Sequence, residues 1–535
     1  MDVIYEDYSQ LHYWNHTDFA YIKHDKALRE FYAYEPSIAS IPEAIKTRKK
    51  FPVNRSLLLN VLKKQYTELG ISFPVLDEVF LSENSFTITT AHQPTLLTGP
   101  LFHIYKIAST IHLAKELSDS IHENTFIPLF LIGSEDHDWA EVNHLNVFGR
   151  MYKWEKDAKG ACGRLSLDGL DKLIHDVIDL FPNAVHIGEI KQILEESQNK
   201  ATNYSQFHRL LLHGLFGRFD LVILDLDDIE LKKTFVPIME KEIREQFSFQ
   251  YVTTTQSALE KAGFKPQAFC RPINMFYMTD QVRERLDPHE GGVIRVDSKV
   301  KYSIEEIVSE LHNHPDRFSP NVILRPLYEE FILPNIAYIG GGGEIAYWLD
   351  RKKQFEVAGV CYPMLIRRNS LLIIDGQTKS QLDKIELTWK DLLPGYDAIV
   401  KTYLRKHSLN ELNYEEEMEM IRKSYETLAV KAERLDPTLA KSIMAEQSKQ
   451  VKQFEQLGSR LLRTEKQQQD TNLKRIQRLK DKLFPDGGLQ ERHENFLSFY
   501  ANYGPEWINK LVEICDPFEE KFMILELQAQ GPSEA

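Results

Sequence analysis

The sequence is poor in cysteine and lacks the segments that direct a chain out of the cytoplasm. Its longest apolar runs, such as Phe126 to Gly133, have the length of a strand rather than the roughly 18 residues of a membrane span. Met1 is followed by acidic residues instead of the basic and apolar regions of a signal peptide. The four cysteines form no Cys-x-x-Cys pair, which argues against a disulfide framework or a zinc cluster; they are Cys162, Cys270, Cys361 and Cys515. We therefore expect a cytoplasmic protein.

Positive charge is also scarce. Lys and Arg number 65 against 79 Asp and Glu, which gives a formal net charge of −14. A general nucleic-acid binder needs a basic face to neutralise phosphates, so this balance argues against that class of protein. A small anionic substrate needs only a few basic side chains, and we expect small-molecule partners with no nucleic acid and no membrane. The 535 residues, 42% of them hydrophobic, suffice for about two to four structural units.

Residues 85–133 have the pattern of a β-loop-α-β unit. Ser85 to Ala91 is rich in β-branched residues and predicts a strand. A loop containing Gly and Pro follows, and Leu101 to Ser118 then has apolar residues at helical spacing. Thr125 to Gly133 is almost continuously apolar, as expected of a parallel strand that is covered on both faces.

Further strands are predicted at Leu221 to Leu226 and, in an αβ rhythm, within Ala337 to Ile374, where MLIRR and LLIID have strand character. Alternating strands and helices favour a parallel sheet with helices on both faces. We predict an α/β fold with a doubly wound core of the Rossmann type.

From about Thr378 the pattern changes to that of a coiled coil. Apolar residues alternate at spacings of three and four, at Met418, Ile421, Tyr425, Leu428 and Ala432. Asp436 can cap and Pro437 can begin a second helix that runs to Leu483, roughly 70 Å at 1.5 Å per residue. The apolar stripe of this helix contains Val451, Phe454, Leu457 and Leu461, followed by Ile476, Leu479 and Leu483.

We interpret residues 378–484 as an antiparallel helical arm, with an ordinary helical subdomain as the alternative. Because such an arm needs a partner surface, we expect a homodimer through the coiled coil. Residues 485–535 look globular again and are predicted to return to the core of residues 1–377.

The first candidate for chemistry is the loop from Ala91 to Pro100. It joins a strand to a helix at the edge where open α/β sheets bind ligands. His92 opens the loop, and its imidazole could hydrogen-bond a phosphate or a carboxylate near the helix N-terminus. The alternative is an ordinary surface or capping histidine.

The second candidate is the segment Ser134 to His144, which follows the next apolar strand and therefore reaches the same sheet edge as His92. Its four carboxylates and two imidazoles would pack poorly between buried strands. Crowded carboxylates raise each other's pKa values, and one paired with His could act as a general base. Asp, Glu and His are also ligands for Mg²⁺ or Zn²⁺, although the His-Glu-x-x-His spacing is missing. The plain alternative is a solvated acidic loop.

The third candidate is the run of four glycines from Gly340 to Gly343. It lies between an apolar stretch and a helix-like segment, so backbone N–H groups could approach a nucleotide or another anion closely. The run does not fit G-x-G-x-x-G, and the chain has no Walker A sequence. A plain tight turn is therefore an equal alternative.

The three candidate segments follow one another in an order and spacing that resemble a known family. The motifs are HQP-x-L-x-x-GP with Tyr105-Lys106, SEDHD-x-x-E-x-NH, the series Arg325-Pro326, Leu333-Pro334 and Ala337-Tyr338, and then GGxGEIAYW. The later Leu483-Phe484-Pro485, Leu489 to Arg492 and Tyr503-Gly504-Pro505 fit as well. Over nearly the whole chain the sequence resembles the BshC family, the cysteine ligases of bacillithiol biosynthesis. Gly342 departs from this pattern, where the family often has Pro, and we expect this change only to loosen the loop.

The resemblance implies a Rossmann-type core with inserted connecting segments, here roughly residues 150–300, similar to class I aminoacyl-tRNA synthetases, and a dimerising coiled coil. It implies a ligase of the carbon–nitrogen (amide) class that joins the carboxyl of cysteine to the amine of glucosaminyl-malate. Because an amide does not form spontaneously from a carboxylate and an ammonium, we expect activation by ATP or another nucleotide, with Mg²⁺ as a possible cofactor and no tightly bound cofactor.

Within this scheme we assign roles to individual residues. His92 would stabilise the charge that develops on the phosphate, and Asp136, His137 or Asp138 would deprotonate the amine or hold Mg²⁺. Substrate-binding candidates are Gln93, Lys106, Asn143, His144, Arg325, Tyr338, Glu344 and Tyr347, and Gly340, Gly341, Gly342 and Gly343 are candidates for anion binding. A second nucleotide site is possible at Gln490, Arg492 and Tyr503.

One cleft between His92 and the glycine run is expected to bind a small anion, with Lys106, Arg325 and Arg367 as its cations. Two other functions stay open. The first is a nucleotidyltransferase or acyl-activating enzyme with another substrate, and the second is a non-catalytic scaffold built on the coiled coil. Consumption of glucosaminyl-malate distinguishes the ligase from both.

Overall fold

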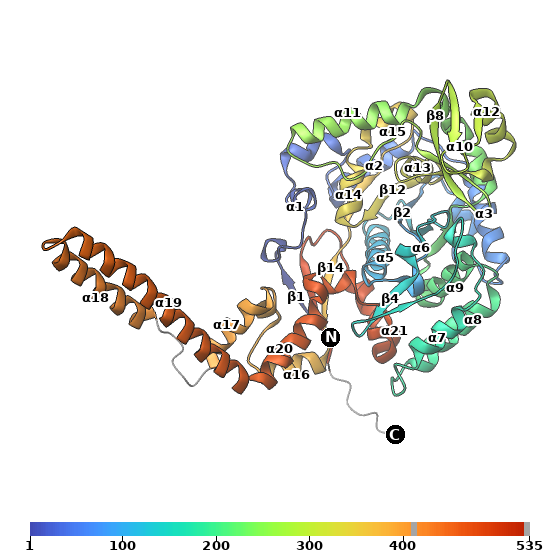
Figure 1. Cartoon of the computed structure of the whole chain (residues 1–535). Helices are drawn as coiled ribbons and strands as arrows, with labels where there is room; N and C mark the ends of the chain where they lie inside the picture. The colour runs from blue at the N-terminus through green and yellow to red at the C-terminus, as the bar shows by residue number, and fades with distance from the viewer. Residues whose placement is uncertain (408–414, 529–535) are drawn as a thin grey trace. The chain divides into compact units, whose positions relative to one another are not determined.

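The computed structural model describes residues 1–407 and 415–528, which form two units (Figure 1). The first unit contains residues 1–372 and 490–525, and the second contains residues 373–489 and the residues from 526 onward. Residues 408–414 of the predicted arm and 529–535 of the predicted C-terminal segment lie outside the described residues. Within the described part of the chain, no helix is long and apolar enough to cross a membrane.

The first unit is built on a parallel sheet of the Rossmann type, so the predicted fold class is confirmed. Its strand order is β13-β12-β2-β3-β6, and all neighbouring strands are parallel. In chain order these strands are the fifth, fourth, first, second and third, so the order reverses between β2 and β12, where folds of this type bind ligands. The bounds are β2 (Ser85–His92), β3 (Thr125–Ile132), β6 (Val222–Asp225), β12 (Asn335–Gly340) and β13 (Met364–Arg367).

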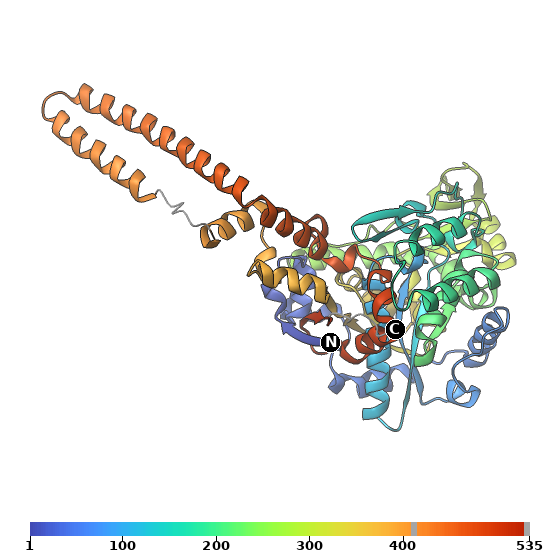
Figure 2. The same cartoon turned by 90° about the horizontal axis from the view of Figure 1, so that it is seen from below.

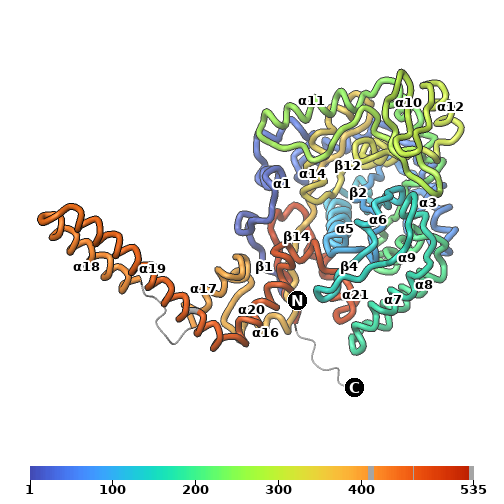
Figure 3. The backbone as a smooth tube through the Cα atoms, in the orientation of Figure 1, coloured from blue at the N-terminus to red at the C-terminus, as the bar shows by residue number. Residues whose placement is uncertain are grey.

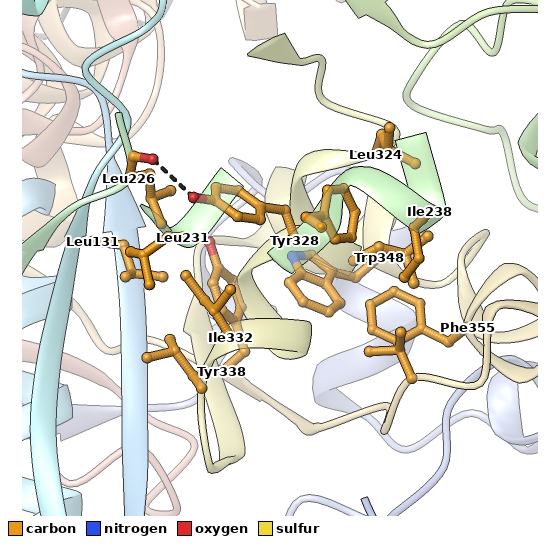
Figure 4. Packing of buried hydrophobic residues seen from close by; sticks show 14 of the residues in the cluster. Leu131, Leu226, Leu231, Ile238, Leu324, Tyr328, Ile332, Tyr338, Trp348 and Phe355 are labelled. Atoms are coloured by element: carbon orange, nitrogen blue, oxygen red, sulfur yellow. Dashed lines mark hydrogen bonds between the residues drawn. The ribbon is translucent and has the colours of Figure 1, made fainter. Parts of the chain in front are cut away.

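Hydrophobic clusters cover both faces of this sheet because successive strand residues point to opposite faces. Ile127, Leu129 and Leu131 of β3 join a cluster with α3 (Arg55–Thr67), α10 (Ile229–Glu245) and α13 (Arg325–Ile332). Phe86 and Ile88 of β2 join another cluster with α2 (Ile41–Arg48) and α5 (Phe102–Ser120). Figure 4 shows part of the first cluster, where the Tyr328 hydroxyl on α13 donates a 3.0 Å hydrogen bond to the Leu226 carbonyl.

Residues 150–300 are not one insertion, because β6 of the central sheet lies within this range. One inserted segment precedes β6 and contains the hairpin of β4 (His144–Val147) and β5 (Arg150–Lys153), then α7 (Leu170–Ile178), α8 (Ile187–Lys200) and α9 (Tyr204–Phe216). The other follows α11 (Phe247–Lys261) and is an antiparallel sheet in the order β10-β9-β8-β7-β11. Its strands are β7 (Met275–Met278), β8 (Arg283–His289), β9 (Gly292–Arg295), β10 (Lys301–Ser303) and β11 (Phe318–Pro320).

A third sheet ties the two ends of the first unit together. Its order is β1-β15-β14, from β1 (Asp2–Glu6), β15 (Phe522–Glu526) and β14 (Ser370–Ile374). The predicted strand LLIID therefore belongs to this sheet and not to the central αβ series. Before β15, the helix α21 (Leu497–Ile514) packs on α5.

The second unit consists of helices, including an antiparallel hairpin of α18 (Glu415–Glu433) and α19 (Pro437–Gln468) (Figures 2 and 3). Asp436 caps α19 by accepting a 2.7 Å hydrogen bond from the Thr438 amide, and Pro437 is the first helical residue, as predicted. The predicted helix to Leu483 is interrupted at Gln469, after which α20 (Asp470–Leu483) begins. Other helices of this unit are α16 (Gly376–Lys384) and α17 (Tyr396–His407).

The predicted seam is only partly correct. Ala429 and Ala432 are buried between the helices, whereas Leu428 is 52% exposed, because the short alanines and not the leucine face α19. On α19, Val451 and Phe454 are half-buried. Leu457 and Leu461 of the predicted stripe are exposed, whereas its later residues, Ile476, Leu479 and Leu483 on α20, are buried.

Candidate functional site

A cavity of about 800 Å³ opens at the carboxyl ends of β2, β3 and β12. Its volume is that of a site for a small molecule. His92 ends β2, Asp136 follows β3, and the glycine run follows β12, so the point where the strand order reverses brings all three predicted segments together. The predicted residues on its wall are His92, Gln93, Asp136, His137, Asp138, Arg325, Tyr338, Gly341, Gly342, Gly343, Glu344, Tyr347 and Arg492.

Seven predicted site residues do not line this cavity: Lys106, Gly340, Asn143, His144, Arg367, Gln490 and Tyr503. Arg367, a predicted cation of the cleft, instead binds Asp18 at 2.7 Å. Asn143 and His144 contact each other at 3.4 Å beside β4. Arg492 lines the same cavity as His92, so it does not mark a second, separate nucleotide site.

The loop after His92 has an unusual backbone and is held by a residue from far along the chain. Leu97, Thr98 and Gly99 have φ values of 44°, 67° and 60°, a region that non-glycine residues seldom occupy. The Asn495 side chain donates hydrogen bonds of 2.8 and 2.7 Å to the carbonyls of Leu97 and Gly99. This pair of bonds stabilises the strained conformation, which ordinary local interactions would not maintain.

His92 is a neutral hydrogen-bond acceptor in this environment. Burial and the charge of Lys106 lower its pKa to about 4. Nδ1 lies 3.0 Å from the Gln93 carbonyl, so Nδ1 carries the proton and Nε2 keeps its lone pair. A neutral imidazole of this tautomer cannot donate to a phosphate through Nε2, which argues against the charge-stabilising role that the sequence implied.

Behind His92, two further imidazoles continue into the core. His103 stacks on His92 with ring centroids 4.8 Å apart, and the centroid of His208 lies 5.4 Å from that of His103. Both His103 and His208 are fully buried, and neither ring nitrogen of His208 has a hydrogen-bond partner among the described residues. Burial lowers the pKa of His208 to about 3 and that of His103 well below its usual value.

The buried rings of His103 and His208 predict that the protein loses stability in mild acid. The folded state keeps His103 and His208 neutral, whereas the unfolded chain binds protons below a pKa of about 6.5. Stability is therefore complete above pH 6.5 and falls as the pH is lowered toward the folded pKa values. From pH 7.5 to 5.5 the two residues should reduce the free energy of unfolding by about 3 kcal/mol. Chemical denaturation at both pH values measures this difference.

A matched variant isolates one of the two rings. His208→Leu removes one titrating ring whose nitrogens have no partner, so it should fold and lose roughly half of this pH dependence. If wild type and variant show the same slope with pH, the buried imidazoles are not its cause.

Asp136 is the centre of a hydrogen-bond network. Its Oδ2 accepts a 2.7 Å bond from the Gln93 side chain, and its Oδ1 accepts a 2.7 Å bond from the His137 amide. Burial favours the neutral acid, but the His137 bonds and the charges of Arg325 and Arg283 outweigh it and hold the pKa of Asp136 far below its usual value. Asp136 is therefore an ionised acceptor that positions its neighbours, and a poor proton acceptor.

His137 is fixed in one tautomer by Arg283. The guanidinium has no acceptor atom, so its Nη1, 2.9 Å from His137 Nδ1, must donate to that nitrogen. In the neutral ring the proton is then on Nε2. The Nε2–H group is therefore free to donate a hydrogen bond to a ligand, whereas Nδ1 is occupied by Arg283.

Two predicted residues hold the sheet edge together, Lys106 from behind the cavity wall and Glu344 on the wall itself. Lys106, fully buried on α5, donates to the Ala91 carbonyl and to Glu344 Oε1 at 2.8 Å. Glu344 also accepts from the Tyr338 hydroxyl at 3.0 Å and from the Gly341 amide at 2.8 Å. One ion pair thus connects β2, β12 and α14 (Gly342–Trp348). It also occupies the Gly341 amide, which the sequence offered for anion binding.

Gly342 has a more specific role than the predicted loosening of its loop. A Cβ at this position would lie 2.0 Å from the Asp18 carboxyl carbon, and Asp18 is held by Arg367. Glycine therefore lets α1 (His16–Ile22) approach the loop.

The cavity has equal numbers of basic and acidic side chains on its wall. The arginines are Arg271, Arg283, Arg325, Arg368 and Arg492, and the carboxyl groups are those of Asp136, Asp138, Glu141, Glu329 and Glu344. The strong negative charge of the whole chain is thus offset at this one place, where both anionic and cationic groups of a ligand would find partners.

The sequence did not identify Arg283, Arg368 and Glu329. Arg283 lies on β8, in an insertion with no recognisable motif. Arg368 directly follows the predicted Arg367, is 3% exposed and pairs with Glu491 at 2.7 Å. Glu329 lies one helical turn after Arg325, which is the spacing that could have revealed it.

The acidic segment does not form a metal cluster by itself. Glu135 is turned away from the cavity and pairs with Lys232 at 2.5 Å. Over residues 1–407 and 415–528, the one group of His, Cys, Asp and Glu close enough to share an ion is His112, Glu116 and Asp516, which does not line the cavity. Magnesium binding stays a prediction.

Comparisons with known proteins cover nearly the whole chain. Residues 6–369 match the N-terminal Rossmann-like domain of bacillithiol biosynthesis BshC, and residues 371–527 match its C-terminal coiled-coil domain. Similar curated proteins are named "Putative cysteine ligase BshC". One from Flavobacterium johnsoniae is 36% identical over 510 residues, which cover 94% of this chain and 96% of the relative.

Other relatives carry the same name. The protein from Christiangramia forsetii is 36% identical over 530 residues, 97% of this chain and 98% of the relative. The protein from Bacillus mycoides is 27% identical over 459 residues, 83% of this chain and 85% of the relative. The similarity therefore extends over both units.

Proposed function

The chain belongs to the BshC family of bacillithiol biosynthesis, and we propose that it joins the carboxyl of cysteine to the amine of glucosaminyl-malate. The observation that carries this proposal is the cavity at the strand-order reversal, with its five arginines and five carboxyl groups. The malate part of one substrate carries carboxylates, and both substrates carry an amine. A site that binds them together therefore needs basic side chains for the carboxylates and acidic side chains for the amines. The product would be bacillithiol, and the enzyme would form a carbon–nitrogen bond in the cytoplasm.

Activation of the cysteine carboxyl is the step that needs an energy donor, and we assign it to ATP. Phosphoryl or adenylyl transfer concentrates negative charge, which preorganised arginines stabilise. Arg283, Arg325, Arg368 and Arg492 are the side chains on the cavity wall that can do so. Magnesium would accompany the nucleotide.

We assign the other predicted residues different parts in this scheme. Asp136 orients Gln93, His137 and the two arginines beside it. His137 can donate through Nε2 to a ligand oxygen, and His92 can accept through Nε2 from a ligand hydroxyl or amine.

The direct test uses the purified protein with cysteine, glucosaminyl-malate and ATP. Mass spectrometry should detect bacillithiol together with the spent nucleotide, and each omission of a substrate should abolish the product. Full turnover without ATP would refute the energy donor alone. Loss of ATP without consumption of glucosaminyl-malate would instead favour an acyl-activating enzyme with another acceptor.

We further propose that the hairpin of α18 and α19 makes a homodimer. Its exposed apolar side chains support this, because single chains leave them in water: Met420, Leu428, Val430, Leu439, Met444, Leu457 and Leu461. Replacing Leu457 and Leu461 with Glu should turn the dimer into a monomer in light scattering, because charges would enter an apolar seam.

A control variant shows whether the effect is specific to Leu457 and Leu461 or follows from any charge added to the hairpin. Leu435→Glu changes a residue that is 85% exposed at the hairpin turn and should leave the dimer intact. A double variant that remains dimeric would place the interface elsewhere.

A further inference from the structure

Glu329 has no assigned part in the chemistry above, although it lies on the wall of the cavity. We propose that Glu329 forms an amine subsite: its carboxyl binds the primary amine of the acyl acceptor and takes the proton that this nitrogen loses when the amide forms. This inference rests on the proposed function and adds the base that the function requires.

The position of Glu329 fits contact with a ligand. It lies on α13, one turn after Arg325, and its side chain is among those that line the cavity. Only 3% of its surface is exposed, and no hydrogen bond to its carboxyl is found within residues 1–407 and 415–528. A buried carboxyl without a partner is costly, and a ligand N–H group would satisfy it.

The other carboxyl groups on the wall are less suited to this task. Asp136 accepts hydrogen bonds from Gln93 and from the His137 amide, and two arginines lie beside it. Both effects lower its pKa, so it is a poor proton acceptor. Glu344 is engaged by Lys106, Tyr338 and Gly341. Asp138 and Glu141 are exposed, so water competes with the amine for them.

The electrostatic environment suits a proton acceptor that works near neutral pH. Burial raises the pKa of Glu329 to about 8; the nearby Glu344 also raises it, whereas Arg325 and Lys106 oppose the shift. A base is most effective when its pKa is close to the working pH, because it can then take up the proton and release it again.

The proposed step forms one C–N bond and breaks one bond to the leaving group. The nitrogen lone pair attacks the activated carboxyl carbon of cysteine, and the C–N bond forms. The bond from that carbon to the phosphate-type leaving group breaks, and the leaving group keeps its electron pair. The proton from nitrogen moves to an ionised Oε of Glu329 and passes to solvent after the product leaves.

The chain offers a matched control in the next residue. Glu330 is fully buried, and burial also raises its pKa to about 8. Its Oε1 accepts a 2.6 Å bond from Asn335, and Glu330 lines a different cavity, of about 470 Å³. Glu330→Gln therefore tests the loss of a similar buried carboxyl that does not line the site.

We expect Glu329→Gln to lower kcat by ~10²–10⁴-fold. Wild-type kcat should rise with pH through an apparent pKa near 8 because only ionised Glu329 accepts the proton. Glu329→Gln should lose this rise, Glu330→Gln should keep it, and Glu329→Asp should recover part of the rate. Wild-type kcat and an unchanged pH profile in Glu329→Gln would overturn the proposal.

Binding measurements distinguish failure of this inference from failure of the proposed function. In calorimetry, Glu329→Gln should weaken binding of glucosaminyl-malate but not of an analogue whose amine is replaced by hydroxyl. If cysteine binding weakens instead, the subsite receives the amine of cysteine and the acceptor assignment is wrong. If the wild type binds glucosaminyl-malate without ever forming bacillithiol, the proposed ligase reaction fails while the amine subsite stands.

Discussion

Replacing Asp136 with asparagine is expected to reduce product formation about 10²–10³-fold while the protein stays folded. The amide side chain has the same shape, but it lacks the charge that lies 3.6 Å from Arg283 and 4.0 Å from Arg325. Without that charge the two guanidinium groups repel each other, and asparagine has one acceptor oxygen in place of the two that serve the Gln93 side chain and the His137 amide. Steady-state rates with the three proposed substrates measure the effect.

A surface substitution of the same kind provides the control. Asp280→Asn removes an exposed carboxylate 3.3 Å from Arg164 and should leave the rate unchanged. A normal rate in Asp136→Asn would show that the network at the end of β3 is structural and takes no part in turnover.

Replacing Lys106 with methionine is expected to lower the free energy of unfolding by about 3–5 kcal/mol and to abolish activity. Methionine fills similar space, but the half-buried carboxylate of Glu344 would lose its counter-charge, and the link from α5 to α14 would be lost. Chemical denaturation of the purified variant measures the loss of stability. Lys115→Met, on the exposed side of the same helix, should have little effect.

A second substitution tests whether the cost comes from the uncompensated charge. Glu344→Gln in the Lys106→Met background should restore part of the stability, because no unpaired carboxylate then remains at the sheet edge. If the two losses simply add, the ion pair does not hold the sheet edge together.

The sequence was sufficient to predict the sheet and the edge at which the site lies. Apolar runs followed by His92, by Asp136 and by the glycine run identify strand ends, and parallel strands place their carboxyl ends together. This part of the prediction needs only periodicity and the rule that ligands bind where the strand order reverses.

Which of two adjacent residues faces the site could not be predicted. Arg367 and Arg368 differ by one position, yet the first binds Asp18 and the second lines the cavity. Glu329 and Glu330 likewise line different cavities, and Ala429 is buried where Leu428 is not. Adjacent residues lie on different faces of a strand or helix. Packing against distant segments decides which of these faces points to the site.

The sequence also did not reveal the residues that reach the site from distant segments of the chain. Arg283 reaches His137 from an antiparallel sheet that has no motif of its own, and Asn495 holds the loop after His92 from across the sequence. These contacts join residues that are 146 and 398 positions apart, and no local pattern encodes them.

The two hydrogen bonds from Asn495 have a consequence for synthesis on the ribosome. All five strands of the central sheet and all the described helices of the second unit are translated before Asn495 emerges. Until then the nascent chain can form its sheet but not fasten the loop with φ values of 44° and 67° at Leu97 and Thr98, nor pair Arg368 with Glu491. Catalytic competence is thus acquired last, so a prematurely terminated polypeptide would be an inactive product open to proteolysis at that loop.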